Sequence, residues 1–186
     1  MADEVILVDG RDRDIGYEDK DACHRIPVKL HRAFSVFIMN KDGEMLIQKR
    51  APAKKTWPGY WSNACCSHPR RGEELQEAVS RRLQQELGFT CSVEHVFTFR
   101  YRADFSKEFG ESEIDHVFVG QYDGKVLPNN DEIEEWRFVS SIELSRDVRR
   151  NPYKYSPWFR KALPRVMEYI TRQSHKGNSR DQHPSL

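Results

Sequence analysis

The sequence has few cysteines, no excess of either charge and no long hydrophobic run. Its four cysteines, Cys23, Cys65, Cys66 and Cys91, lack C-x-x-C spacing, which argues against a structural zinc site made of thiolates. Lysine and arginine total 30 and aspartate and glutamate total 29, so there is no broad basic surface for nucleic acid. No apolar run has the length of a membrane span.

These absences set the expected compartment and partners. The start, MADEVILVDG, is acidic and its apolar run is too short for a signal peptide, so we expect a cytoplasmic protein with reduced thiols. We expect a small-molecule substrate, no nucleic acid, no membrane, and a monomer or weak homodimer. The 186 residues suffice for one domain with a real core.

The hydrophobic pattern predicts an α+β fold, a mixed sheet covered by helices. Alternation and β-branched residues predict strands, and helical periodicity with capping residues predicts helices. Arg11–Asp21 is highly charged, and we expect a loop there. The predicted strands are Val5–Val8, Ala33–Met39, Glu44–Lys49, Cys91–Tyr101, one from Glu111, and Glu134–Val139. The predicted helices are Glu73–Leu87, Ser140–Val148 and one that begins at Ser156-Pro157.

The helix over Glu73–Leu87 carries two charged residues inside its apolar stripe. Arg82 and Glu86 are four residues apart and therefore neighbours on one face. They form either an ion pair at the edge of the stripe or a pair that points into a cleft. In a cleft, the acid would bind a metal and the base a phosphate.

The segment before this helix holds a thiol and an imidazole. If Ser62–His68 is extended, Cys66 and His68 share one side and Cys65 takes the other. Further along, Glu111 and Glu113 share one strand face, so we expect a cation or a proton between them. Simpler interpretations are a buried thiol, an ordinary polar histidine and a solvent-facing edge strand.

Taken together, the polar residues suit two kinds of ligand. Imidazoles and carboxylates suit Zn²⁺ or Mn²⁺, basic side chains suit a diphosphate, and a further carboxylate suits the Mg²⁺ that bridges to it. Cys66 and Tyr101 add titratable groups, while Trp158 by itself would be assigned to the core. The metal candidates are His24, His31, His68, Glu111 and Glu113; the diphosphate candidates are Lys20, Arg50, Lys54 and Arg82; the Mg²⁺ candidate is Glu86.

Several motifs in order resemble the type I isopentenyl-diphosphate Δ-isomerases, a branch of the Nudix fold. They are LHRAF, KKTWPGYWSNACCSHP, RRLQQELG, FRYRA, ESE and YSPW, together with His24, and the resemblance covers about Val5 to Ile170. It implies a Nudix-like α+β sandwich over residues 1–170, followed by a polar, flexible tail over 171–186.

The Nudix signature itself is incomplete. The helix keeps Glu73, Arg81, Leu83, Glu86 and Phe89, all aligned on the glycine that ends it. The chain departs from the signature in having Ser67 where the signature has glycine, and Arg82 and Gln85 where hydrolases have glutamate. Because those carboxylates activate water in hydrolases, the departures favour the isomerase branch over pyrophosphate hydrolysis.

The resemblance also implies a role for each candidate residue. The first metal, Mn²⁺ or Zn²⁺, would be held by His24, His31, His68, Glu111 and Glu113. Mg²⁺ would be held by Glu86 and the Cys66 backbone carbonyl, and the diphosphate by Lys20, Arg50, Lys54 and Arg82. The catalytic residues would be Cys66, Glu113, Tyr101 and Trp158.

The implied reaction moves a double bond by adding a proton at C4 of isopentenyl diphosphate and removing one from C2. Two acid/base groups on opposite faces of the substrate suit this transfer. We favour Glu113, with Tyr101, as donor and Cys66 as acceptor, with the roles exchanged in reverse. The Trp158 ring would stabilise the carbocation. A Nudix hydrolase of a diphosphate and a catalytically silent metal-binding module are the competing functions.

Overall fold

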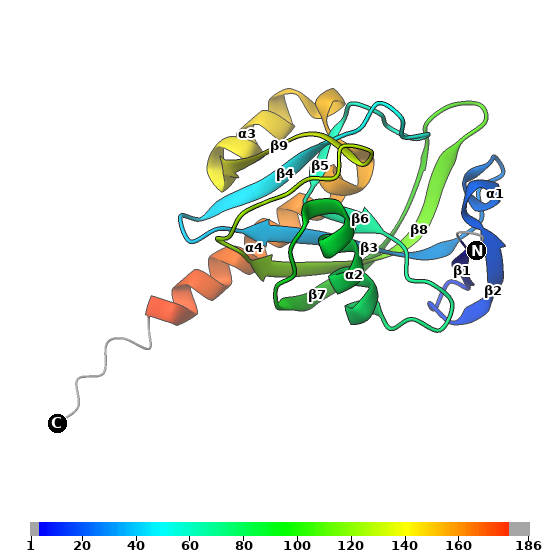
Figure 1. The fold of residues 1–186 in the computed structure, drawn as a ribbon, viewed down its shortest axis with the longest axis horizontal. Helices are drawn as coiled ribbons and strands as arrows, with labels where there is room; N and C mark the ends of the chain where they lie inside the picture. Colours follow the sequence, from blue (N-terminus) through cyan, green and yellow to red (C-terminus); the bar gives the residue numbers. More distant parts are fainter. Residues whose placement is uncertain (1–3, 179–186) are drawn as a thin grey trace.

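The computed structural model describes residues 4–178, with the side chains described through residue 173 (Figure 1). In this range nine strands form one sheet, in which β2, β1, β3, β4 and β5 follow one another and the other strands branch from this path. The strands are β1 (Glu4–Val8), β2 (Asp14–Asp19), β3 (His31–Met39), β4 (Glu44–Arg50), β5 (Trp61–Asn63), β6 (Cys65–Ser67), β7 (Val93–Asp104), β8 (Gly110–Gln121) and β9 (Ile133–Ser140).

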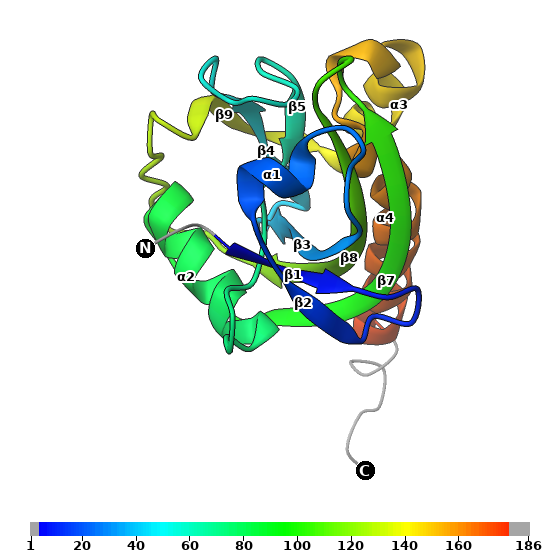
Figure 2. The same ribbon diagram turned by 90° about the vertical axis from the view of Figure 1, so that its right-hand side faces the viewer.

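The helices lie on the two faces of this sheet. Figure 2 shows α2 and α4 on opposite sides of it. The helices of the described range are α1 (Lys20–His24), α2 (Leu75–Leu87), α3 (Ser141–Arg150) and α4 (Pro157–Asn178), with a short 3₁₀ turn at Pro152–Lys154. The chain is therefore the α+β sandwich that the sequence predicts. None of the helices within residues 4–178 combines the length and apolarity that a membrane crossing needs.

Strand β3 is the centre of the sheet because it pairs with several other strands. It runs parallel to β8 along its whole length, from His31 opposite Glu113 to Met39 opposite Gln121. Its other edge pairs with β1, β6 and β4 in turn. Side chains alternate along a strand, so residues opposite each other in β3 and β8 point to the same face.

Helix α2 packs on one face of the sheet through the predicted apolar stripe. Ala78, Val79, Leu83 and Leu87 are fully buried and form a core with strand residues that include Phe34, Val36, Ile38 and Phe118. Gly88 ends the helix in the left-handed conformation, at φ 74°. The other face is covered by α3 and α4, whose core includes Leu144, Phe159, Leu163 and Val166.

The structure differs from the sequence-based expectation near both ends. Arg11–Asp21, expected to be a loop, contains β2 and the start of α1. Strand β2 is mostly exposed and pairs with β1, so its composition is that of a solvated segment although its backbone is extended. Helix α4 continues past Ile170 to Asn178, into the expected tail. Residues 179–186 of that tail lie outside the described part of the chain.

Candidate active site

One cavity of about 360 Å³ is lined by residues of α1, the β4–β5 loop, β6, α2, β8 and the start of α4. Most of the predicted site residues line it. The lining residues among them are Lys20, His24, Arg50, Lys54, Cys66, His68, Arg82, Tyr101, Glu111, Glu113 and Trp158. The remaining two, His31 and Glu86, are buried behind this lining, at 0% and 3% exposure.

The first end of the cavity, called here the metal end, consists of His24, His31, His68, Glu111 and Glu113. One ligand atom each from His24, His31, His68 and Glu113 lies within 4.8 Å of all the others. Because β3 and β8 are parallel and in register, His31 faces Glu113 directly. His68 follows β6, which pairs with β3, and His24 ends α1. The sheet therefore brings together residues that are far apart in sequence.

The spacing of these atoms suits a divalent ion. His31 Nε2 lies 3.1 Å from His68 Nε2 and 3.3 Å from Glu113 Oε1, and His68 Nε2 lies 3.0 Å from the same oxygen. Ligands held at about 2.0–2.1 Å from a tetrahedral metal are roughly 3.3 Å apart. Nitrogen and oxygen donors together match Zn²⁺ or Mn²⁺ chemistry, so these residues fit a metal of that class.

Glu111 lies beside this group. Its Oε2 is 2.7 Å from His24 Nε2, and its Oε1 accepts a 2.8 Å hydrogen bond from the Thr56 hydroxyl. Strand β8 is flanked by β3 and β7, and Glu111 and Glu113 are 5% and 6% exposed. The simpler interpretation of a solvent-facing edge strand is therefore wrong.

The protonation of the histidines follows from burial and neighbours. Burial, reinforced by the positive charges of His31 and Lys20, lowers the pKa of His68 well below its usual value, so its imidazole is neutral. Burial also opposes the charge on His31, but hydrogen bonds with Cys23 and Glu113 outweigh it and raise the pKa. A neutral imidazole is the form that binds a metal.

Cys66 reaches the cavity from β6, while its neighbour Cys65 points into the α2 core, as the alternation predicts. The Cys66 thiol donates to Asn63 Oδ1 at 2.9 Å and accepts from Trp158 Nε1 at 3.0 Å. The Asn63 amide is fixed because its Nδ2 donates to the Val36 and Cys65 carbonyls. Burial raises the pKa of Cys66 to about 12, so this residue is a thiol.

Glu113 is the second acid/base candidate, and Tyr101 donates to its Oε2 at 2.5 Å. Burial raises the pKa of Tyr101 well above its ordinary value, and the nearby carboxylates add to this effect. Burial also opposes the charge on Glu113, yet its hydrogen bonds with His31 and Tyr101 lower its pKa. Glu113 is therefore ionised beside a neutral phenol.

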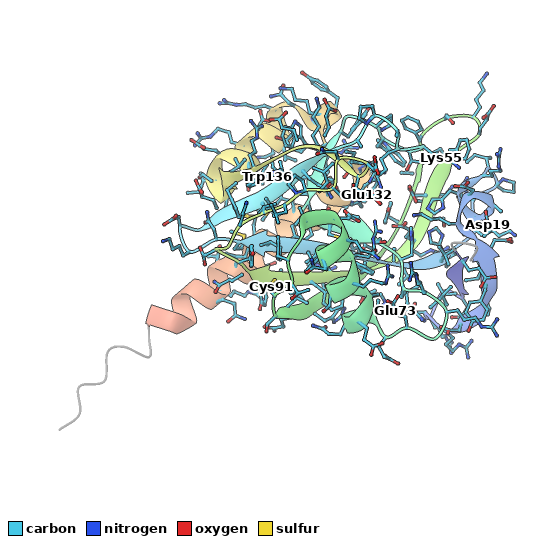
Figure 3. The ribbon with its side chains drawn as sticks, viewed as in Figure 1. Asp19, Lys55, Glu73, Cys91, Glu132 and Trp136 are labelled. Atoms are coloured by element: carbon cyan, nitrogen blue, oxygen red, sulfur yellow. The ribbon has the colours of Figure 1, made fainter. Side chains whose placement is uncertain are left out.

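The second end of the cavity, called here the basic end, consists of Lys20, Arg50, Lys54 and Arg82. Arg82 donates to Glu86 at 2.5 Å, so the two residues form the predicted ion pair. Arg82 also lines the cavity, as the alternative interpretation of the pair predicts. Glu132, labelled in Figure 3, lies on the segment that leads into β9. It contacts both Lys54 and Arg82. These ion pairs hold the Lys54 and Arg82 side chains at the cavity wall.

Trp158 lies between the two ends. Its ring is 5.4 Å from that of Trp57 and 6.3 Å from that of Tyr101, and the guanidinium carbon of Arg50 is 5.1 Å from its ring centroid. The helix that carries it begins at Pro157, at the predicted Ser-Pro start, and the Ser156 carbonyl accepts from the Arg160 N–H at 3.1 Å. Trp158 therefore contributes both an aromatic wall and the N–H that contacts Cys66.

Sequence reasoning missed several polar residues of the site. Asp115 continues the alternation of Glu111 and Glu113, and that pattern could have identified it; it accepts from Ser35 at 2.8 Å. Asn63 lies three residues before Cys66, but nothing in the sequence marks it as the acceptor of the thiol proton. Thr56 and Glu132 act through contacts made by the folded chain, and no local pattern indicates them.

A family model described as the NUDIX domain matches residues 29–160. The chain is 45% identical over 167 residues to "Isopentenyl-diphosphate Delta-isomerase 1" of Aromatoleum aromaticum, covering 90% of this chain and 94% of that protein. It is 38% identical to the "Isopentenyl-diphosphate Delta-isomerase" of Burkholderia multivorans, covering 95% of this chain and 100% of that protein.

Solved structures share the fold at lower identity. A Deinococcus radiodurans protein superposes with a TM-score of 0.72 at 19% identity, covering 88% of this chain and 98% of that one. A MutT protein from Methanosarcina mazei gives a TM-score of 0.61 at 20% identity, covering 76% of this chain and 95% of that one. At these identities the likeness establishes the architecture alone.

Proposed function

This chain belongs to the isopentenyl-diphosphate Δ-isomerases, within the Nudix family, and on that premise we propose that it interconverts isopentenyl and dimethylallyl diphosphate. The single observation that carries the assignment of residues is that Cys66 and Glu113 line the same cavity. They come from different strands, β6 and β8, and the basic end lies in the same cavity. An isomerase of this kind needs two acid/base groups and an anchor for the diphosphate.

The proposed cofactors are one Mn²⁺ or Zn²⁺ ion at the metal end and Mg²⁺ at the basic end. His24, His31, His68, Glu111 and Glu113 would hold the first ion, which would polarise the carboxylate it contacts. Glu86 and the Cys66 backbone carbonyl would hold Mg²⁺, whose charge would offset that of the diphosphate. Glu86 is 3% exposed, and its carboxylate contacts Arg82, a diphosphate candidate that lines the cavity.

The protein groups carry the proton transfer. Cys66 holds its proton toward Asn63, while Glu113 is ionised and accepts a hydrogen bond from the neutral phenol of Tyr101. Toward dimethylallyl diphosphate we keep the order favoured from sequence, with Glu113 and Tyr101 as donor and Cys66 as acceptor. Because the reaction is reversible, each residue serves in both roles.

Trp158 and the surrounding aromatic residues exclude water and face the reacting carbons. A tertiary carbocation would be captured as an alcohol if water reached it. An aromatic face stabilises a desolvated cation by about 2 kcal/mol or more. Trp57, Tyr101 and Trp158 supply such faces at the cavity wall or directly behind it.

The test is isomerisation in deuterated water by protein supplied with Mg²⁺ and with Mn²⁺ or Zn²⁺. We expect interconversion of the two diphosphates and deuterium in the product. Absence of both with metal-loaded protein would refute the proposal. Release of phosphate from nucleoside diphosphate derivatives would instead support the competing hydrolase function. Arg82 and Gln85, which interact at 3.1 Å, argue against that function because they replace water-activating carboxylates.

The compartment and assembly remain predictions. We propose a cytoplasmic enzyme that acts on a small diphosphate as a monomer or weak homodimer, with neither nucleic acid nor membrane as a partner. Analytical ultracentrifugation over a range of concentrations would test the assembly state.

A further inference from the structure

Thr56 contacts both ends of the cavity, although neither the sequence pattern nor the family resemblance assigns it a role. It lies in the loop between β4 and β5 and is 6% exposed. Its hydroxyl donates to Glu111 Oε1 at 2.8 Å. Its carbonyl accepts from the Arg50 guanidinium, at 2.8 Å from one terminal nitrogen and 3.2 Å from Nε. One residue therefore joins a metal-end carboxylate to a basic-end cation.

The hydroxyl determines which oxygen of Glu111 is available. Oε1 is occupied by Thr56, and Oε2 faces the metal end, 2.7 Å from His24 Nε2. A carboxylate held by one oxygen presents the other in a fixed direction. Hydrogen-bond partners of this kind, outside the ligand set, commonly change metal affinity 10- to 100-fold when removed.

The backbone around Thr56 is tied to Arg50 by hydrogen bonds. Trp57 has a positive φ of 45°, which is unfavourable for a bulky residue and persists only where the surroundings enforce it. Its carbonyl accepts from Arg50 Nε at 3.1 Å, and the Gly59 N–H donates to the Arg50 carbonyl at 2.9 Å. A shift of Arg50 toward a diphosphate would therefore move the backbone that carries the Thr56 hydroxyl.

We propose that Thr56 is a positioning residue that orients Glu111 for the metal and couples metal binding to diphosphate binding through Arg50. The inference rests on the proposed function for the identity of the two ligands. Coupling is reciprocal: if the metal strengthens diphosphate binding by some factor, the diphosphate strengthens metal binding by the same factor.

The experiment compares wild type with Thr56→Val, which keeps the shape and loses the hydroxyl, and Thr56→Ser, which keeps the hydroxyl. Mn²⁺ affinity is measured by chelator competition. Inorganic pyrophosphate in excess Mg²⁺ is then titrated calorimetrically into Mn²⁺-loaded and chelator-stripped protein, and the ratio of the two Kd values gives the coupling. Thr98→Val is the matched control, because the Thr98 hydroxyl contacts His95 and His116 away from the cavity.

We expect a wild-type ratio of about 5 to 150. Thr56→Val should weaken Mn²⁺ binding about 10- to 100-fold and bring the ratio close to one. Thr56→Ser and Thr98→Val should stay within about threefold of wild type for both quantities. Unchanged Mn²⁺ affinity and an unchanged ratio in Thr56→Val would overturn the inference, as would a wild-type ratio of one.

A second variant separates positioning from misfolding. If Thr56 acts through Glu111, then adding Thr56→Val to Glu111→Gln should weaken Mn²⁺ binding no further, whereas additive losses would contradict the proposal. These measurements need no turnover. Coupled binding without isomerisation would refute the proposed function alone, and isomerisation with Thr56-independent coupling would refute this inference alone.

Discussion

The two ends of the cavity are built in different ways. At the metal end, His31, Glu111 and Glu113 come from paired strands, and their positions follow from the register of β3 and β8. At the basic end, Lys20, Arg50, Lys54 and Arg82 come from helices, a strand end and a loop, and ion pairs hold Lys54 and Arg82. Pairing of the strand backbones therefore positions the metal-end residues, which lie close to the proposed proton transfer. Ion pairs between side chains position Lys54 and Arg82 of the basic end, which are proposed to bind the diphosphate. Changes at the first end should therefore affect turnover, and changes at the second should affect binding.

The largest expected effect is at Cys66, where the proton transfer is proposed. Cys66→Ala removes one of the two acid/base groups, and turnover should fall by about 10²- to 10⁴-fold, measured as deuterium incorporation into product. Cys65→Ala is the matched control. Cys65 is fully buried in the α2 core, so its loss should lower the free energy of unfolding by about 1 kcal/mol and leave turnover unchanged. Equal turnover in the Cys66→Ala and Cys65→Ala variants would contradict the proposed role of Cys66 and, with it, the division of the cavity into a reacting end and a binding end.

The next effect concerns metal binding and can be measured without substrate. Mn²⁺ or Zn²⁺ at 100 times its Kd should stabilise the folded state by about 2.7 kcal/mol. That corresponds to a rise in melting temperature of roughly 5–11 °C for a chain of this size. His68→Ala should reduce the rise severely, while His95→Ala, an exposed residue outside the cavity lining, should retain it. A rise that is insensitive to His68 would place the metal elsewhere.

A smaller effect is expected at the basic end. Lys54→Gln removes one charge-assisted contact to the diphosphate, so KM should rise by about 10- to 100-fold while kcat changes little. Lys49→Gln is the control, because Lys49 pairs with Glu134 and lies outside the cavity lining. A fall in kcat as large as that of Cys66→Ala would mean that the two ends do not divide binding from chemistry.

The smallest effect is a pH dependence of binding. Burial lowers the pKa of Lys54 to about 8. The charged form predominates below that pH and is lost above it, so the affinity for pyrophosphate should decline as pH rises through 8. Lys54→Arg should remove this decline, because arginine stays charged over the whole range. Calorimetric titrations between about pH 7 and pH 9.5 would test this, and an unchanged decline in Lys54→Arg would assign it to another group.

The sequence predicted what local patterns encode. The apolar stripe of α2, the hairpin of β3 and β4, and the Ser156-Pro157 start of α4 were all visible as periodicity, turn residues and caps. Alternation correctly separated Cys65 from Cys66 and grouped Glu111 with Glu113. The short helix α1 was missed because five residues give no periodic signal, and β2 was missed because an exposed edge strand can be as charged as a loop.

Contacts between distant segments could not be predicted from local patterns. The parallel pairing of β3 with β8 joins segments about eighty residues apart, and only this pairing brings His31 to Glu113. The link from Thr56 to Glu111 and the bridge by Glu132 likewise depend on loops whose paths the sequence does not specify. Most of the residues that the family resemblance implies as site residues line one cavity, but their supporting contacts come from the fold.

The residues of the metal end come together only when β3 and β8 pair in the correct register, so metal binding would report correct pairing of these two strands. A slip of one position along this pair would turn every side chain of the shifted strand to the opposite face of the sheet. The His31 imidazole and the Glu113 carboxylate would then no longer face each other. Molecules trapped with misaligned strands would thus lack the proposed metal site and any thermal stabilisation that metal binding would give. Insertions should be tolerated at the Asn40–Gly43 turn but not inside either strand, so engineering of this scaffold is best confined to its turns.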